Sequence, residues 1–262
     1  MGTPVSLRSD RGSRTDTMPT TTDTVTTPDG TCPVTFVTPD GDGPWPGVVM
    51  YPDAGGARAT FDQMAEKLAG LGYAVLVPDV YYRSGAWQPF DMATVFSDQD
   101  ERTRLFGMIG SVTQEAMATD ASAFFDYLAG RPEVAGEKFG TTGYCMGGRT
   151  SLVVAGRVPE RVGAAMSFHG GGLVTDADDS PHRRAGQIQA AVYVGGARDD
   201  GSFTEDDAAT LEKALDAAGV EHTVEIYPAG HGFAVPDNPP YDAAAAARHW
   251  EAMARVFGRA LS

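Results

Sequence analysis

Short apolar runs alternate with amphipathic segments along most of this chain. Seven runs have the length and the β-branched or aromatic content of buried strands, and they lie at residues 32–39, 46–53, 73–81, 138–144, 162–170, 189–196 and 222–229. Apolar residues at helical spacing mark four further segments, at 59–72, 114–130, 204–219 and 241–261. Alternating strands and helices predict an α/β fold, with a mostly parallel central sheet and helices on both of its faces.

Two segments depart from this alternation. Residues 1–30 are rich in Thr, Ser, Asp and Pro, so we expect a disordered N-terminal tail before a domain at 31–262, with Met18 as an alternative start. Residues 84–112 contain aromatic residues and methionines without a clear period. Such an insertion either covers the functional site at the strand ends or packs at the periphery, and the sequence leaves both interpretations open.

Composition narrows the class of protein further. The 262 residues fit one α/β domain, and the formal net charge of −15 argues against a nucleic-acid partner, which would need basic clusters. Two cysteines are too few for a disulfide framework. The chain shows no apolar run long enough to span a membrane and no signal-peptide pattern. We therefore expect a cytoplasmic protein without a membrane partner, whose oligomeric state the sequence does not indicate.

A cysteine surrounded by glycines is the first candidate for chemistry. In "GTTGYCMGGRT", residues 140–150, Cys145 falls between the predicted strand at 138–144 and a fifth predicted helix, "MGGRTSLVVAG" at residues 146–156. Gly143 and Gly147 lie on either side of it. A G-x-nucleophile-x-G turn at this place holds the central residue in a strained conformation above the sheet, and the helix N-terminus favours a thiolate. The alternative is a buried structural thiol, which is also our interpretation of Cys32.

A thiol nucleophile needs a base and an acid that orients the base. His231 follows a predicted strand on the glycine-rich loop "AGHGF", and His169 in "SFHGGG" is the reserve candidate. Asp199 and Asp200 follow another strand and are the candidate acids. The order nucleophile, acid, base along the chain is that of α/β-hydrolases.

Together these stretches resemble the dienelactone hydrolase family, whose members are α/β-hydrolases with a cysteine nucleophile. The resemblance rests on "GYCMGG", "PGVVMYPDAGG", "LGYAVLVPDVYYRSG" and "YPAGHGFAVPD", and it spans about residues 32–260. It implies the α/β-hydrolase fold. It also favours Asp200 over Asp199 as the acid, because "DGSFT" matches the motif D-x-x-[V/F]-[P/T] that often contains the acid in family members.

The resemblance also assigns expected roles to residues around the nucleophile. Asp53 takes the position of a family glutamate that helps manage the thiol proton, although its side chain is one methylene shorter. The fold implies an oxyanion hole formed by the N–H groups of Met146 and Ala54. Family enzymes that act on dienelactone bind the substrate carboxylate with arginines, for which this chain offers Arg102 or Arg104.

One family position departs from the pattern, because Val235 stands where an arginine follows the catalytic histidine. The expected reaction is hydrolysis of a small ester or lactone through Cys145, His231 and an aspartate. It requires no metal or organic cofactor, and the chain lacks the sequence motifs of common metal and phosphate sites. Two alternatives remain: a broad short-chain carboxylesterase, favoured by Val235, and a non-hydrolytic thiol-sensing or binding protein on the same fold.

Overall fold

The computed structural model describes residues 18–261 and places eight strands in one sheet. The strands are β1 (Thr20–Thr27), β2 (Gly30–Val37), β3 (Trp45–Tyr51), β4 (Ala74–Pro78), β5 (Val134–Tyr144), β6 (Val162–Phe168), β7 (Ala191–Ala197) and β8 (His222–Tyr227). Their order across the sheet is β1-β2-β4-β3-β5-β6-β7-β8. The first two pairings are antiparallel, and all pairings from β4 to β8 are parallel, as the alternating pattern predicts.

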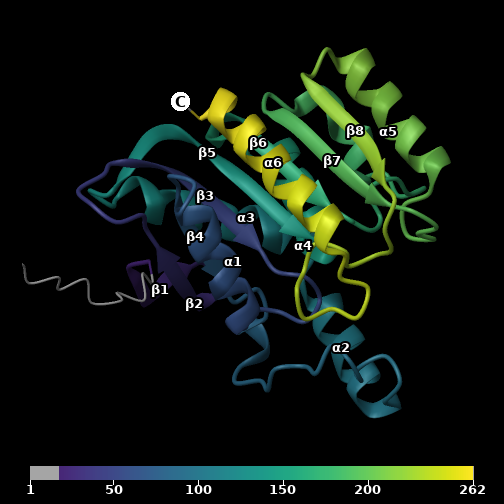
Figure 1. Cartoon of the computed structure of the whole chain (residues 1–262), viewed down its shortest axis with the longest axis horizontal. Coiled ribbons are helices and arrows are strands. Elements are labelled where there is room, and N and C mark those ends of the chain that lie inside the picture. Colours follow the sequence, from purple (N-terminus) through teal and green to yellow (C-terminus); the bar gives the residue numbers. More distant parts are fainter. Residues whose placement is uncertain (1–17, 262) are drawn as a thin grey trace, which may run out of the picture.

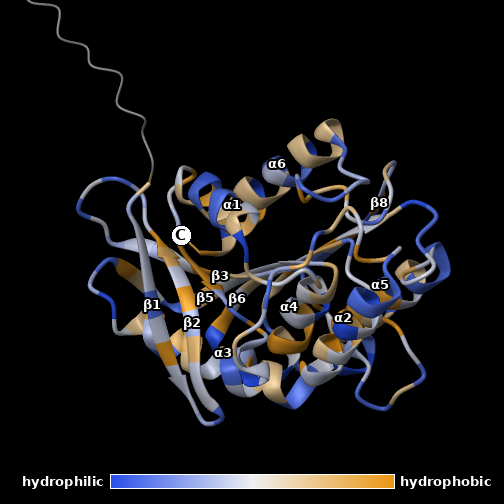
Figure 2. Cartoon of the chain, turned by 90° about the horizontal axis from the view of Figure 1, so that it is seen from below, coloured by the Kyte–Doolittle hydropathy of each residue, from blue (hydrophilic) through white to orange (hydrophobic). Residues whose placement is uncertain are grey.

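Helices cover both faces of the sheet (Figures 1 and 2). They are α1 (Ala59–Ala69), α2 (Gln99–Ser111), α3 (Gln114–Ala129), α4 (Met146–Arg157), α5 (Glu205–Ala218) and α6 (Ala243–Ala260), with short 3-10 turns at Tyr82–Ser84, Pro159–Arg161 and Pro181–Gln187. Figure 2 shows α1 and α6 on one side and α3, α4 and α5 on the other. The sheet therefore separates two hydrophobic cores.

Each core forms because an apolar helix face meets the apolar side chains of the central strands. Phe61 and Leu68 of α1 pack with Val48 in one core, and Phe124 and Leu128 of α3 pack in the other. All five residues are fully or almost fully buried. Complete burial of one such side chain stabilises the fold by about 1.5–3 kcal/mol.

Two elements lie where the apolar pattern indicates none. Residues 20–27, which we assigned to a disordered tail, form β1, and residues 1–17 of that tail lie outside the described residues. The run "TTTDTVTT" is poor in large apolar groups, but its β-branched residues suit an edge strand, and β1 pairs along its whole length with β2. Helix α2 lies within the aperiodic segment 84–112 and buries only Leu105 and Met108.

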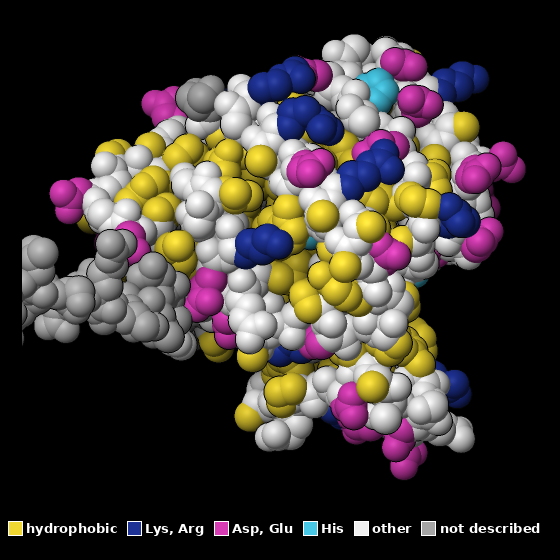
Figure 3. All heavy atoms as spheres, in the orientation of Figure 1, with side chains coloured by type: hydrophobic (Ala, Val, Ile, Leu, Met, Phe, Trp, Pro, Cys, Tyr) yellow, Lys and Arg dark blue, Asp and Glu magenta, His cyan; other side chains and the backbone are white. Residues whose placement is uncertain are grey.

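Helix α2 projects from the body of the molecule (Figures 1 and 3). On the face shown in Figure 3, Lys and Arg side chains lie among Asp and Glu side chains instead of forming one continuous basic patch. Among the described residues, no helix combines the length and the apolarity that crossing a bilayer demands. The candidate site lies where the parallel strands β3, β5, β7 and β8 end, since their carboxyl ends share one edge of the sheet.

Candidate active site

Cys145 occupies a sharp turn between β5 and α4. Its backbone has φ 53° and ψ −113°, a strained conformation for a residue with a side chain, and the residue is partly exposed. The flanking glycines are required by close packing: a Cβ on Gly143 would lie 2.0 Å from the carbonyl oxygen of Gly147, and a Cβ on Gly147 would lie 2.2 Å from that of Tyr51. The turn thus places Cys145 at the end of the sheet, next to the end of β3.

His231 lies beside Cys145 and is oriented by an aspartate. Its Nδ1 is 2.6 Å from Oδ2 of Asp200. Burial alone would lower the pKa of His231, but hydrogen bonds with Asp200 and Cys145, together with their negative charges, raise that pKa to about 10. Because Asp200 occupies Nδ1, the other ring nitrogen is the one available to the thiol. The imidazole therefore lies next to both Asp200 and Cys145, in the wall of one pocket.

Asp200 is itself held in place by Ser202. The backbone N–H and the hydroxyl of Ser202 both donate to Oδ1 of Asp200, at 2.9 and 2.7 Å. Burial alone would raise the pKa of Asp200, but the hydrogen bonds from His231 and Ser202 lower it to about 2. Of the two candidate acids, Asp200 is the one in contact with the imidazole, whereas Asp199 lies in the left-handed region at φ 55°. Asp200 therefore remains a carboxylate beside His231 at neutral pH.

The reserve candidate His169 lies directly behind His231. The two ring centroids are 5.2 Å apart, but the ring of His169 is completely buried and packs against Phe233. Burial and the charge of His231 lower the pKa of His169 well below its usual value, which keeps the ring neutral. His169 does not line the pocket that reaches Cys145, so it packs behind His231 and lies outside this pocket.

The two expected oxyanion-hole residues, Ala54 and Met146, contact the same tyrosine. The hydroxyl of Tyr81 donates to the carbonyl oxygen of Ala54 at 2.8 Å and lies 3.7 Å from the sulfur of Met146. Tyr81 is completely buried, so it fixes the loop after β3 relative to the start of α4. No sequence motif marks Tyr81, since its partners are 27 and 65 residues away in the chain.

Asp53 lines the pocket, but its carboxylate is fully engaged by other groups. Arg58 donates to both oxygens at 2.7 and 3.1 Å, and the amide of Gly55 and the side chain of Asn238 donate at 2.9 and 3.0 Å. The side chains of Asp53 and Arg58 are 2% and 7% exposed. Asp53 is therefore part of a buried ion pair, in addition to its position near the thiol.

A pocket of about 500 Å³ opens over Cys145 and His231. Its wall contains Asp53, Ala54, Met92, Ala93, Phe96, Ser97, Gly232, Asn238, Pro239 and Pro240. Residues 92–97 come from the segment 84–112, so this insertion borders the site. Among these lining residues there is no Lys or Arg, and most of the wall is apolar.

The two arginines proposed to bind a substrate carboxylate do not line this pocket. Arg104 pairs with Glu101 at 2.6 Å, donates to the carbonyl oxygen of Gln88 and covers the ring of Phe90 at 3.8 Å. Arg102 lies 3.5 Å from the carbonyl oxygen of Phe96. Both arginines belong to the segment 84–112, and these partners lie within the same segment. Within residues 18–261, no group of three or more His, Cys, Asp or Glu side chains is arranged to hold a metal ion.

Comparison with known proteins places this chain in a family. The model of the dienelactone hydrolase family matches residues 33–261. A protein of Escherichia coli (strain K12) with the provisional name carboxymethylenebutenolidase is 28% identical over 223 residues, which cover 82% of this chain and 78% of that protein.

Solved structures agree with this assignment. A dienelactone hydrolase-like promiscuous phosphotriesterase from metagenomic libraries is 31% identical, with a TM-score of 0.74 over 93% of this chain and 99% of that one. A provisionally named dienelactone hydrolase from Klebsiella pneumoniae has a TM-score of 0.79 at 23% identity, covering 92% and 99% of the two chains, and this likeness shows the shared fold. The matched family model and the common fold establish that this chain belongs to the dienelactone hydrolase family, a family of hydrolases.

Proposed function

We propose that this protein hydrolyses small, uncharged carboxylic esters or lactones, with Cys145 as nucleophile, His231 as proton carrier and Asp200 as the acid that orients it. The observation that carries this proposal is the position of His231, which bridges Asp200 and Cys145 in the wall of a pocket that contains no Lys or Arg. The triad geometry supports acyl transfer, and the uncharged wall supports the choice of substrate.

The reaction starts from a thiolate of Cys145 beside a protonated His231. The thiolate attacks the carbonyl carbon, and the C=O electron pair moves to oxygen. As the tetrahedral intermediate collapses, His231 gives its proton to the departing alkoxide and becomes neutral. Neutral His231 then takes a proton from water, the resulting hydroxide attacks the thioester, and the acid leaves as Cys145 returns to the thiolate. Asp200 holds the same imidazole orientation through both steps.

The oxyanion of each tetrahedral intermediate needs donors near the thiol. The N–H of Met146, at the first position of α4, and the N–H of Ala54 are the proposed donors, and the N-terminus of α4 adds a favourable potential. Tyr81 holds both residues in one arrangement before substrate binds. Loss of one oxyanion-hole donor typically reduces kcat by about 100-fold to 1,000-fold.

The charge of the pocket separates uncharged esters from dienelactone, which carries a carboxylate. Asp53 contributes the only formal charge among the lining residues other than the catalytic pair, and that charge is negative and already paired with Arg58. A substrate carboxylate would lose water without gaining an ionic partner there. We therefore expect kcat/KM for p-nitrophenyl acetate and butyrate to exceed that for dienelactone by about tenfold or more, equivalent to about 1.4 kcal/mol. Faster hydrolysis of dienelactone would contradict this substrate preference.

The triad itself is tested separately from the substrate. The variant Asp200→Asn should lose about 10⁴-fold in kcat, because an amide no longer fixes the required imidazole tautomer. Asp199→Asn is the matched control and should retain most activity. Intact-protein mass spectrometry of quenched turnover should detect an acyl adduct on Cys145. Activity retained in Asp200→Asn, or an adduct on another residue, would overturn the assignment.

A further inference from the structure

Arg58 joins two loops that carry opposite sides of the candidate active site. Its Nη1 and Nη2 donate to Asp53 at 2.7 and 3.1 Å, and its Nε and Nη2 both donate to Asp237 at 2.7 Å. Asp53 precedes Ala54 in the loop after β3, and Asp237 lies six residues after His231 in the loop after β8. One guanidinium therefore holds the proposed oxyanion loop and the histidine loop together.

The sheet does not connect these two loops directly. Strands β5, β6 and β7 lie between β3 and β8, so no ladder of backbone hydrogen bonds sets the distance between their ends. The nucleophile turn after β5 lies between them in the sheet order. A direct side-chain bridge is thus the shortest connection across the site. It is reinforced by Asn238, which donates to Asp53 from the histidine loop at 3.0 Å.

Burial makes this bridge rigid. The Arg58 side chain is 7% exposed, its guanidinium covers the ring of Phe61 at 4.9 Å, and it also donates to the carbonyl oxygen of Gly56. Asp237, which is 37% exposed, receives a further hydrogen bond from the hydroxyl of Thr60 at 2.8 Å. A planar guanidinium can bind two carboxylates with fixed geometry, which a lysine ammonium cannot do.

We propose that Arg58 is a positioning residue for the hydrolytic reaction, which sets the distance between the oxyanion loop at Ala54 and the histidine loop at 231–240 by binding Asp53 and Asp237 at once. This inference rests on the function proposed above. It also assigns Asp53 a structural role as an anchor for Arg58, in place of a role as acceptor of the thiol proton. The bridge acts on transition-state geometry more than on substrate affinity, because Arg58 does not line the pocket.

The test removes the more exposed carboxylate, so that the fold is retained. In Asp237→Ala the histidine loop loses its ionic contact with Arg58, while the pair between Arg58 and Asp53 stays. We expect kcat for p-nitrophenyl acetate to fall about 10-fold to 100-fold, because a displacement of about 1 Å can cost that much. KM should change less than about threefold, and Asp237→Asn, which keeps one acceptor, should lie between wild type and Asp237→Ala.

A matched control is provided by Arg83, which bridges Asp29 and Asp120 elsewhere in the molecule. Asp29→Ala removes the more exposed partner of that arginine and should leave kcat within about twofold of wild type. Equal losses in Asp237→Ala and Asp29→Ala would indicate general destabilisation and overturn the proposal, as would kcat within twofold of wild type in Asp237→Ala.

Hydrogen exchange separates this inference from the proposed function. In Asp237→Ala the amides of Gly55 and Gly56, which donate to Asp53, should exchange faster, although the substitution lies on the other loop. Peptides from the nucleophile turn should be unchanged. Wild-type protein without esterase activity would defeat the proposed function, yet this exchange pattern would still show whether the bridge couples the loops. Unchanged exchange at residues 53–56 would overturn the inference.

Discussion

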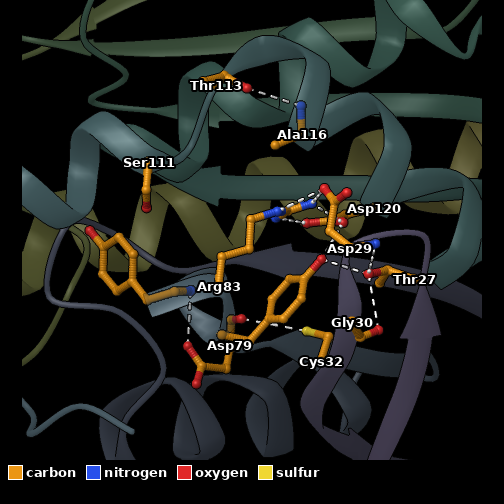
Figure 4. A network of polar contacts seen from close by, with 12 residues as sticks. Thr27, Asp29, Gly30, Cys32, Asp79, Arg83, Ser111, Thr113, Ala116 and Asp120 are labelled. Atoms are coloured by element: carbon orange, nitrogen blue, oxygen red, sulfur yellow. Dashed lines mark hydrogen bonds and ion pairs between the residues drawn. The ribbon is translucent and has the colours of Figure 1, made fainter. Parts of the chain in front are cut away.

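Two regions of this molecule are built from the same residue types. At the candidate active site, Arg58 lies between Asp53 and Asp237. Asp53 belongs to the loop after β3, which lines the same pocket as Cys145. On the side of the N-terminal hairpin, Arg83 lies between Asp29 and Asp120, with salt bridges of 2.7 Å to each, in the same network as Cys32 (Figure 4). Each region thus contains one cysteine and one arginine held by two carboxylates.

The two regions differ in the surroundings of their cysteines, which set the exposure and the protonation of each thiol. Cys32 is completely buried in β2, and its sulfur lies 3.4 Å from the carbonyl oxygens of Pro33 and Asp79. Burial, with the nearby negative charges of Asp120 and Asp79, raises the pKa of Cys32. Cys145 is at the start of a helix, beside His231 and open to a pocket. A reactive thiol therefore depends on its position at the carboxyl edge of the sheet more than on local composition.

Replacing each cysteine by alanine in turn tests the difference between the two thiols and should give the largest effect. Cys145→Ala should reduce kcat for p-nitrophenyl acetate by about 10⁴-fold to 10⁶-fold, because no other group can form the acyl intermediate. Cys32→Ala should retain kcat within about twofold, because its thiol has no base and no route to substrate. Steady-state kinetics on both variants, with circular dichroism to confirm folding, provide the measurement. Comparable losses in the two variants would contradict the distinction between the regions.

On the side of the N-terminal hairpin, replacing Asp120 should reduce stability and leave activity unchanged. Its carboxylate accepts from the hydroxyl of Tyr82 at 2.9 Å and from two nitrogens of Arg83, with the side chain 9% exposed. Asp120→Asn removes one of the two carboxylates that pair with Arg83 and leaves Asp29 as its ionic partner. We expect the free energy of unfolding to fall by about 1.5–3 kcal/mol, the range for loss of a hydrogen bond to a charged group. Denaturant titration measures this change. A large decrease in kcat with unchanged stability would show that this region also serves catalysis.

The same contrast shows what the sequence could predict. The sequence pattern located seven strands and five helices, because a buried strand or a helix face leaves a local pattern. Strand β1 was missed, because its Thr-rich segment becomes a strand only through pairing with β2. Helix α2 was missed because it buries two residues of thirteen, too few for a visible period.

At the candidate site, short motifs and chain order singled out Cys145, His231 and the pair Asp199 and Asp200, since each lies just beyond a strand. The family resemblance favoured Asp200 over Asp199, and it is Asp200 that contacts His231. The same reasoning missed Arg58, whose partner Asp237 is 179 residues away in the chain. Ionic partners that lie on separate loops leave no periodic or spacing signal in one sequence. For the same reason, the sequence could not show that Arg102 and Arg104 lie outside the lining of the pocket and contact other residues of their own segment, 84–112.

The stability of the two regions should also depend differently on pH. The pKa of His231 is raised to about 10, so its stabilising contribution is complete below about pH 6.5 and is lost as pH rises through 10. Asp200, with a pKa of about 2, contributes above about pH 4 and loses this contribution as pH falls through 2. The difference in Tm between wild type and His231→Asn should therefore be largest between about pH 4 and 6.5 and should decrease toward pH 10.

Asp120→Asn is the comparison for this titration. The pKa of Tyr82 is raised to about 12 and that of Arg83 is raised above its usual value, so both groups stay protonated through pH 10. The difference in Tm between wild type and Asp120→Asn should be nearly constant from pH 5 to 10. A slope equal to that of His231→Asn would show that the pH response belongs to the whole fold.

The smallest effect concerns Arg104, an arginine near the pocket that contacts neither catalytic loop. It pairs with Glu101, donates to the carbonyl oxygen of Gln88 and packs on Phe90, all within the segment 84–112. Exposed pairs of this kind contribute about 0–1 kcal/mol. Arg104→Ala should therefore change kcat/KM for an uncharged ester less than about twofold, with Arg102→Ala as the matched variant. If Arg104→Ala instead raised KM for a carboxylate-bearing lactone about tenfold and left the uncharged ester unaffected, the inserted segment would have to move and bring this arginine to the substrate.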